Sequence, residues 1–307
     1  MPHMLMILLA ACTAAGTDNA VLVENGRARS VIVVPDQATP TVRHAAEELQ
    51  RYFKRMTSVE VPVVTESKIS PLQRGSAPVR IDVGLTGRAK QWLPTDLTSN
   101  EERVVVRSGP GGIFVCGGGD RGTLFAVYRF LETLGCRWLT PEPQNEFVPE
   151  RKTLAVGRLA IDTQPAFRWR LFIGGTGQRE AWGLKMGFNG LYRPETAEQN
   201  GDCLYWPSAV PGVHAYCRII PPDRYFKTHP EWFPLINGRR VPSSLLTNQL
   251  CVTAPGLADE FAKNVCRIFD KDQRCRLISI SPNDGYGWCQ CPKCRELDQR
   301  LCGARTT

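Results

Sequence analysis

Apolar and polar residues follow two regular patterns along the first 140 residues, one typical of strands and one typical of helices. Apolar residues at helical spacing, such as Ala45, Leu49 and Phe53, predict an amphipathic helix over 41–56, and a more apolar helix is expected over 123–134. Short stretches rich in Val and Ile, flanked by turn-forming residues, predict strands at 30–35, 61–65, 79–84, 101–107 and 112–116.

The connections between these elements indicate how they pair. The turn Ser108-Gly109-Pro110-Gly111 favours a hairpin between the last two strands. Gly135 stands where a helix should stop. A stretch rich in Pro and Glu over 141–165, with a short strand at 153–159, marks a domain boundary near residue 162. The sequence therefore predicts an α+β domain with a mixed sheet and helices over 21–162.

The pattern changes in the second half of the chain. Residues 182–192 predict a helix end that runs into a buried strand, and a strand at 249–253, a helix at 256–269 and a strand at 276–281 follow. Strand, helix and strand at this spacing predict parallel β/α units. A complete (β/α)8 barrel takes about 250 residues. We therefore expect an α/β chain in which 163–307 form the first part of a TIM-type barrel, cut off roughly halfway.

A glycine-rich motif over 117–122 matches Gly-x-Gly-x-x-Gly, the fingerprint of dinucleotide-binding domains. That fold needs a parallel β-α-β unit, whereas the strand before the motif belongs to an antiparallel hairpin. We interpret the motif as a tight turn with Gly at positive φ.

The net charge and the distribution of basic residues indicate which classes of binding partner to expect. The chain carries 38 Lys and Arg against 30 Asp and Glu, a net charge of +8, which allows attraction to acidic polysaccharide, membrane or nucleic acid. The basic residues are scattered singly along the chain, so no nucleic-acid partner is expected.

The only long apolar run, 4–15, is too short to span a bilayer and lies where the apolar part of a signal peptide would be. We interpret 1–20 as a signal or lipoprotein leader. Leu9-Ala10-Ala11-Cys12 resembles a lipoprotein processing box, in which Cys12 would carry the lipid; a plain cleaved signal or a frayed apolar terminus is the alternative. The protein is therefore expected to be exported to the periplasm, the outer membrane or the medium, with a lipid anchor as its only membrane contact.

Residues 115–149 resemble the N-terminal accessory domain of α-glucuronidases and β-N-acetylhexosaminidases, with Arg-Gly-Thr, an aromatic helix and Leu-Gly-Cys-Arg-Trp in order. In those enzymes this domain precedes a catalytic (β/α)8 barrel. The second half is similar to a bacterial family of exported proteins that carries a domain-of-unknown-function label and is grouped with glycoside hydrolases. The motifs that carry this second resemblance lie at 229–233 (HPEWF), 237–239 (NGR), 249–253 (QLCVT) and 279–288 (SISPNDGYGW).

The resemblance implies a glycoside hydrolase, and such chemistry usually requires two carboxyl groups. Asp284 follows an expected barrel strand, where active-site acids lie, although Asn283-Asp284-Gly285 is equally typical of a plain turn. Glu231 is the second candidate acid, with a structural Glu at the start of a helical turn as the alternative. The residues expected to line the sugar site are His214, Asn189, Asn283, Trp206, Trp232 and Tyr286.

Three cysteines, Cys289, Cys291 and Cys294, lie within six residues, and Cys302 follows as a fourth. This spacing suits a structural zinc site, while an exported protein favours a disulfide, so zinc, a disulfide or neither remain open. Other cysteines lie in apolar runs and are interpreted as small buried hydrophobes: Cys116, Cys136, Cys251 and Cys266.

These features together predict a carbohydrate-active protein that hydrolyses O-glycosyl bonds in polysaccharide or glycan, and that requires no cofactor for its chemistry. The alternative is a non-catalytic glycan-binding surface lipoprotein, in which the incomplete barrel keeps a sugar cleft without a full acid pair.

Overall fold

The computed structural model describes residues 19–69, 78–171, 179–190, 214–271, 273, 275 and 277–302. The chain divides into an N-terminal unit (1–168, 173–188 and 198–201) and a C-terminal unit (169–172, 189–197 and 202–307). Residues 1–18 of the predicted leader, with Cys12, and Trp206 lie outside the described residues, whereas Ala20 already begins a strand. Among the helices that are described, none is long and apolar enough to cross a membrane.

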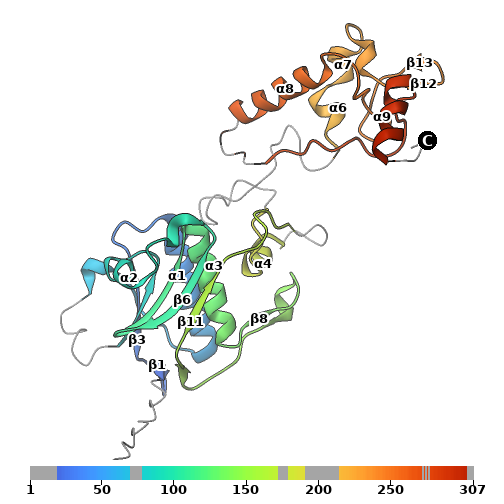
Figure 1. Cartoon of the computed structure of the whole chain (residues 1–307). Helices are drawn as coiled ribbons and strands as arrows, with labels where there is room; N and C mark the ends of the chain where they lie inside the picture. Colours follow the sequence, from blue (N-terminus) through green and yellow to red (C-terminus); the bar gives the residue numbers. More distant parts are fainter. Residues whose placement is uncertain are drawn as a thin grey trace, which may run out of the picture. The chain divides into compact units, whose positions relative to one another are not determined.

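A six-stranded mixed sheet in the order β11-β6-β7-β5-β3-β4 is the centre of the N-terminal unit (Figure 1). β3 pairs in parallel with β4 and β5, and β5 with β7, whereas β6 pairs antiparallel with β7 and β11. The predicted hairpin over 101–116 is therefore confirmed. The strands are β3 (Ser30–Val34), β4 (Val63–Thr65), β5 (Val79–Val83), β6 (Val104–Gly109), β7 (Gly112–Gly117) and β11 (Ala160–Thr163).

Smaller elements surround this sheet. A three-stranded antiparallel sheet and a two-stranded one accompany it, and short helical turns connect the strands. Their bounds are β1 (Ala20–Glu24), β2 (Arg27–Ala28), β10 (Leu154–Val156), β8 (Arg137–Trp138), β9 (Glu146–Phe147), η1 (Glu66–Lys68), η4 (Pro143–Asn145) and α4 (Arg179–Lys185).

Helices α1 (Pro40–Thr57) and α3 (Asp120–Thr133) lie side by side against the sheet, as the apolar periodicity predicts (Figure 1). Their buried faces meet at Phe53 and Phe130, whose ring centroids are 6.4 Å apart. The helix α2 (Gly87–Trp92) and the turn η3 (Leu97–Ser99) pack on side chains of β6 and β7 instead. Both faces of β7 are therefore covered, which fits its nearly continuous apolar sequence.

The glycine-rich motif joins β7 to α3 and owes its glycines to crowding. A Cβ at Gly117 would lie 2.0 Å from the carbonyl carbon of Gly122, and one at Gly118 would lie 1.8 Å from the carbonyl oxygen of Asn100. Gly119 is extended, with φ −149°. The prediction of positive φ at this turn was therefore wrong, because close backbone packing is what excludes a side chain there.

The C-terminal unit contains the helices α8 (Leu257–Lys271) and α9 (Pro292–Cys302), so the predicted helix over 256–269 is confirmed. Within its described residues, the predicted strands at 249–253 and 276–281 form no sheet, and a barrel is not seen. Residues 252–253 lie in a turn, and 277–281 pair with no described strand, which a period of apolar residues cannot reveal. The remaining elements are α6 (Tyr216–Ile219), α7 (Pro222–Tyr225), η6 (Pro230–Trp232), β12 (Leu235–Ile236) and β13 (Arg239–Arg240).

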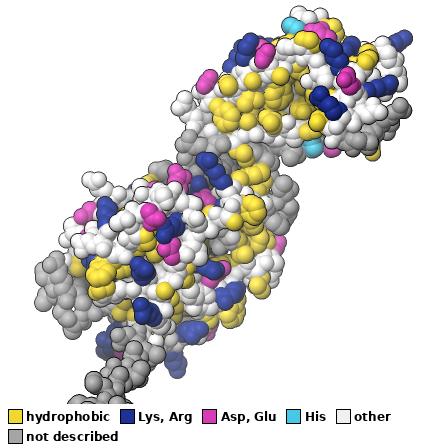
Figure 2. All heavy atoms as spheres, viewed as in Figure 1, with side chains coloured by type: hydrophobic (Ala, Val, Ile, Leu, Met, Phe, Trp, Pro, Cys, Tyr) yellow, Lys and Arg dark blue, Asp and Glu magenta, His cyan; other side chains and the backbone are white. Residues whose placement is uncertain are grey.

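The core of this unit is aromatic and lies between α8 and the short helices. Tyr225, Trp232 and Phe233 are buried together, with Phe261 and Ile268 of α8 packed against them. On the face shown in Figure 2, Lys and Arg side chains stand among acidic ones over both units and do not gather into one patch. This distribution matches the scattered basic residues of the sequence.

Candidate functional site

Two buried amides, Gln249 and Asn283, fix the backbone next to the candidate acid. The Gln249 side chain donates to the carbonyls of Asn283 (3.0 Å) and Gly285 (3.2 Å) and accepts from the Asn283 amide (2.9 Å). The Asn283 side chain donates to the Asn248 carbonyl and accepts from the Cys217 amide, each at 2.9 Å. Asn283 was expected to contact sugar; its side chain instead uses its hydrogen bonds inside the protein.

These amides hold a loop over 284–288, which we call the 284–288 loop. Its backbone is joined to the segment before Cys251 by two further bonds, from the amides of Asn248 to Tyr286 (2.8 Å) and of Gln249 to Gly287 (2.9 Å). Gly285 and Gly287 adopt φ of 80° and 93°, which glycine takes without strain. The loop is therefore built on a fixed backbone.

The side chains of the 284–288 loop point away from the core. Tyr286 is 82% exposed and Trp288 is 39% exposed. Asp284 is also exposed, and its Oδ1 accepts a hydrogen bond from the Gly285 amide at 2.9 Å. One short loop thus presents a carboxylate and two aromatic rings to solvent.

The other predicted site residues lie in different surroundings. The His214 amide donates to Ser281 Oγ at 2.9 Å, which brings His214 near the start of the loop. Glu231 is exposed in the first turn of η6, as its alternative interpretation predicts. Asn189 is buried, and its Oδ1 accepts from the Arg170 amide at 2.8 Å.

Trp232 was expected to contact sugar, but the structure places it in the core. Its Nε1 donates to the Pro255 carbonyl at 2.9 Å, and its ring stacks on His229 with centroids 4.0 Å apart. Only 6% of the residue is exposed. An indole is a large apolar group, and burial with its N–H paired is its most stable arrangement.

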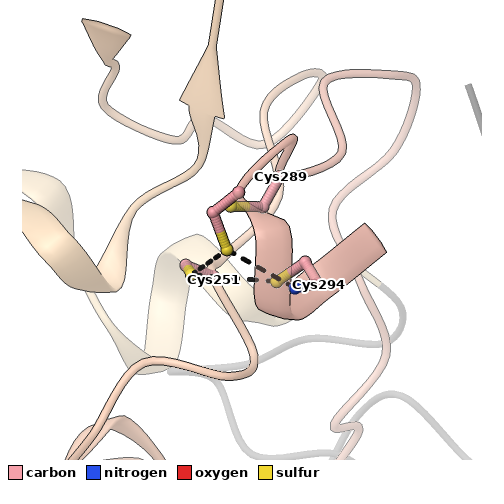
Figure 3. A group of neighbouring side chains, drawn as sticks. Cys251, Cys289 and Cys294 are labelled. Atoms are coloured by element: carbon pink, nitrogen blue, oxygen red, sulfur yellow. Dashed lines mark hydrogen bonds between the residues drawn. The ribbon is translucent and has the colours of Figure 1, made fainter. Parts of the chain in front are cut away.

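A second group of side chains is the cysteine cluster, made of Cys251 and of three residues that follow the loop, Cys289, Cys291 and Cys294. Their sulfur atoms all lie within 4.8 Å of one another, and all four residues are buried. Cys251 Sγ is 3.7 Å from Cys291 Sγ and 3.8 Å from Cys294 Sγ. Figure 3 shows the Cys251, Cys289 and Cys294 side chains meeting from separate stretches of the chain.

Polar groups surround the cysteine cluster. The Leu235 amide donates to Cys289 Sγ at 3.3 Å, and the Cys294 amide donates to Cys291 Sγ at 3.5 Å. Thr253 Oγ1 lies 3.1 Å from Cys294 Sγ, and Arg240 Nη1 lies 3.8 Å from Cys289 Sγ. Each of these donors stabilises negative charge on sulfur.

Hydrogen bonds from the Cys289 thiol, Arg240 and Thr253 together lower the pKa of Cys251 to about 4, against the effect of burial. Elsewhere, burial raises the pKa of Cys136 to about 11, as expected for an inert buried thiol.

Sequence spacing identified three members of the cluster and missed the fourth. Cys251 was interpreted as a buried hydrophobe, because its neighbours in the sequence are apolar and its partners lie about forty residues away. Cys302 was expected instead; its side chain lies outside what the structure describes. Its backbone ends α9, and at a rise of about 1.5 Å per residue it is about 12 Å along the helix from Cys294. Cys266, also expected to be buried, is exposed.

Comparison with known proteins gives one family and several distant structures. The family model described as "Domain of unknown function (DUF4838)" matches residues 140–306. No curated protein sequence matches the chain.

The similar solved structures are named as glycoside hydrolases. The family GH115 4-O-methyl-alpha-glucuronidase BtGH115A is 11% identical over 86% of this chain and 42% of its own, with a TM-score of 0.47. The Flavobacterium johnsoniae chitobiase is 15% identical over 92% and 45%, with a TM-score of 0.42. The Streptomyces coelicolor A3(2) GH20 beta-N-acetylhexosaminidase is 19% identical over 50% and 25%, with a TM-score of 0.32.

The chain thus spans less than half the length of these similar structures. The resemblance noted for the second half of the sequence is confirmed by the family match, which covers more than half of the chain and includes both the 284–288 loop and the cysteine cluster. This protein belongs to the DUF4838 family of domains of unknown function.

Proposed function

We propose that the protein is carbohydrate-active and that the 284–288 loop contacts the glycan. The observation that carries this proposal is the exposure of Tyr286 and Trp288 beside the Asp284 carboxylate on a fixed backbone. The accessory-domain and family motifs in the sequence support the same class of ligand.

The chemistry of the loop suits a sugar. A pyranose has apolar C–H faces, which pack on aromatic rings, and hydroxyls, which donate to a carboxylate. A ligand that packs on exposed aromatic rings removes apolar surface from water, which favours binding. Because Gln249 and Asn283 already hold the loop, binding would cost little conformational entropy. The net charge of +8 favours glycans that carry uronate groups.

We further propose that the glycan is hydrolysed, with Asp284 orienting a sugar group or serving as general acid and Glu231 as the second carboxyl. Asp284 is exposed and accepts a hydrogen bond from the Gly285 amide, an arrangement that suits the orienting role. A non-catalytic glycan-binding protein is the second candidate, and the exposure of both acids favours it, because general acids of glycosidases are held in apolar surroundings.

Binding tests the first part of the proposal. The full chain is titrated with oligosaccharides of glucuronic acid and of N-acetylglucosamine by calorimetry. Tyr286→Ala should weaken binding at least about tenfold, since it removes a stacking ring. Trp92→Ala is the matched control, because Trp92 is an aromatic residue of the N-terminal unit that is 48% exposed. Equal affinities for the wild type and Tyr286→Ala would contradict the loop assignment.

Turnover separates the two candidates. Aryl glycosides of the same sugars are incubated with the wild type, Asp284→Asn and Asp259→Asn, in which Asp259 is an exposed acid of α8. Hydrolysis that is lost only in Asp284→Asn supports the enzyme. Glycan binding without hydrolysis in any variant supports the binding protein.

A further inference from the structure

We propose that the cysteine cluster binds one Zn²⁺ ion as a closed structural site, with Cys251 as the fourth ligand beside Cys289, Cys291 and Cys294. The inference concerns the fold of the C-terminal unit and does not depend on which sugar, if any, the 284–288 loop binds.

The spacing of the sulfur atoms fits a tetrahedral zinc site. Four sulfurs bound tetrahedrally to zinc at about 2.3 Å lie about 3.8 Å from one another. The distances from Cys251 Sγ to the sulfurs of Cys291 and Cys294 are 3.7 and 3.8 Å. A disulfide would hold two sulfurs about 2.05 Å apart, and all four cysteines are free. The spacing therefore matches a shared metal better than a bond between any two of them.

The four cysteine sulfurs are ligands of the kind that structural zinc prefers. Four thiolates are soft ligands, and a site with four protein sulfurs has no position left for water or substrate. All four residues are buried, with Leu235 and Ala254 packed against them. A closed and buried site of this kind is typical of structural zinc and not of catalytic zinc.

The groups around the cysteine cluster stabilise negative charge on its sulfur atoms. Zinc with four thiolates carries a net charge of −2, and a buried charge needs hydrogen bonds and counter-charge. The amides of Leu235 and Cys294 supply two hydrogen bonds to sulfur. Arg240 supplies a positive charge and is held by a second bond, from its Nη1 to the Phe233 carbonyl at 2.6 Å. Such donors around the ligands orient them and tune a metal site.

The site would join two parts of the chain. Cys251 lies before α8, whereas the other three ligands lie before α9 and in its first turn. Zinc would therefore close a loop of about forty residues, which removes conformational freedom from the unfolded chain. It would also hold both ends of the segment that carries the 284–288 loop, since Gln249 stands two positions before Cys251 and Trp288 directly before Cys289 in the sequence.

Cobalt titration tests the site directly. The full chain is reduced, freed of metal and titrated with Co²⁺ under anaerobic conditions. We expect saturation at one equivalent, with the thiolate charge-transfer and visible bands of tetrahedral sulfur-bound cobalt, and loss of these bands on addition of Zn²⁺. A spectrum without these bands, or preferential binding of iron over zinc, would overturn the proposal.

Variants test the identity of the fourth ligand. Cys251→Ser should weaken cobalt affinity by about a hundredfold or more. Cys302→Ser and Cys266→Ser should keep the wild-type stoichiometry and spectrum, and they remain informative even if Cys251→Ser fails to fold. Loss of the bands in Cys302→Ser, or wild-type affinity in Cys251→Ser, would show that Cys251 is not the ligand.

Discussion

Glu146 shows how single residues stabilise this protein through partners that are distant in sequence. It accepts hydrogen bonds from Tyr52 and from Trp138 Nε1, and it pairs with Arg55 at 2.5 Å. Burial raises the pKa of Glu146, but the bonds from Tyr52 and Arg55 outweigh it and lower the pKa to about 2. The residue pattern does not point to Glu146, because it cannot reveal contacts with Tyr52 and Arg55, which lie more than ninety positions away.

The low pKa of Glu146 predicts a pH-dependent contribution to stability. Because the pKa is lower in the folded state than the ordinary value of 4.5, the stabilisation is full above about pH 4.5 and is lost as the pH falls towards 2. Glu146→Gln should reduce the free energy of unfolding at pH 7 by about 2 kcal/mol and at pH 3 by about half as much. Urea unfolding at both pH values measures this, with the exposed Glu150→Gln as control. An equal loss at the two pH values would contradict the assignment.

At the scale of elements, prediction succeeded where local pattern decides the structure and failed where distant partners decide it. The helices α1, α3 and α8 have apolar faces that their sequences display. The segments 249–253 and 276–281 also look like strands, but within the described residues they pair with no strand, and the amides of Gln249 and Cys251 donate to the carbonyls of Gly287 and Trp232 instead. In the 284–288 loop, the sequence predicted site residues only at Asp284 and Tyr286, together with Asn283 directly before the loop.

Gly287 of the 284–288 loop stands where a side chain is not tolerated. A Cβ at Gly287 would lie 2.5 Å from Asn248 Oδ1, and the residue has φ 93°. Gly287→Ala should therefore lower the free energy of unfolding by about 3 kcal/mol, from steric overlap and backbone strain together. Gly238→Ala is the control, because Gly238 has φ 78° with nothing within 4 Å of its Cβ position, and should cost about 1 kcal/mol. Chemical denaturation of both variants compares the costs, and equal losses would contradict the crowding.

For the whole molecule, the two units differ in what stabilises them. The N-terminal unit has a six-stranded sheet covered by helices, whereas the described part of the C-terminal unit has α8, α9, short helical turns, one two-stranded sheet and the cysteine cluster. A unit with little regular structure depends more on crosslinks. The domain boundary near 162 and the barrel remain predictions, since they depend on how long stretches pack.

This difference predicts the effect of metal removal. A strong zinc chelator should lower the unfolding temperature of the C-terminal unit by about 10 °C or more and leave that of the N-terminal unit unchanged. Differential scanning calorimetry with and without chelator measures both transitions, and Cys251→Ser should reproduce the effect without chelator. A shift of both transitions, or of neither, would contradict a zinc site confined to the C-terminal unit.

The metal content of the full chain decides whether the cysteine cluster binds zinc. The protein is produced in zinc-supplemented medium, purified under reducing conditions and measured by elemental analysis. We expect one zinc per chain in the wild type and in Cys302→Ser, and none in Cys251→Ser. Wild-type protein without zinc, or zinc that is retained in Cys251→Ser, would contradict it.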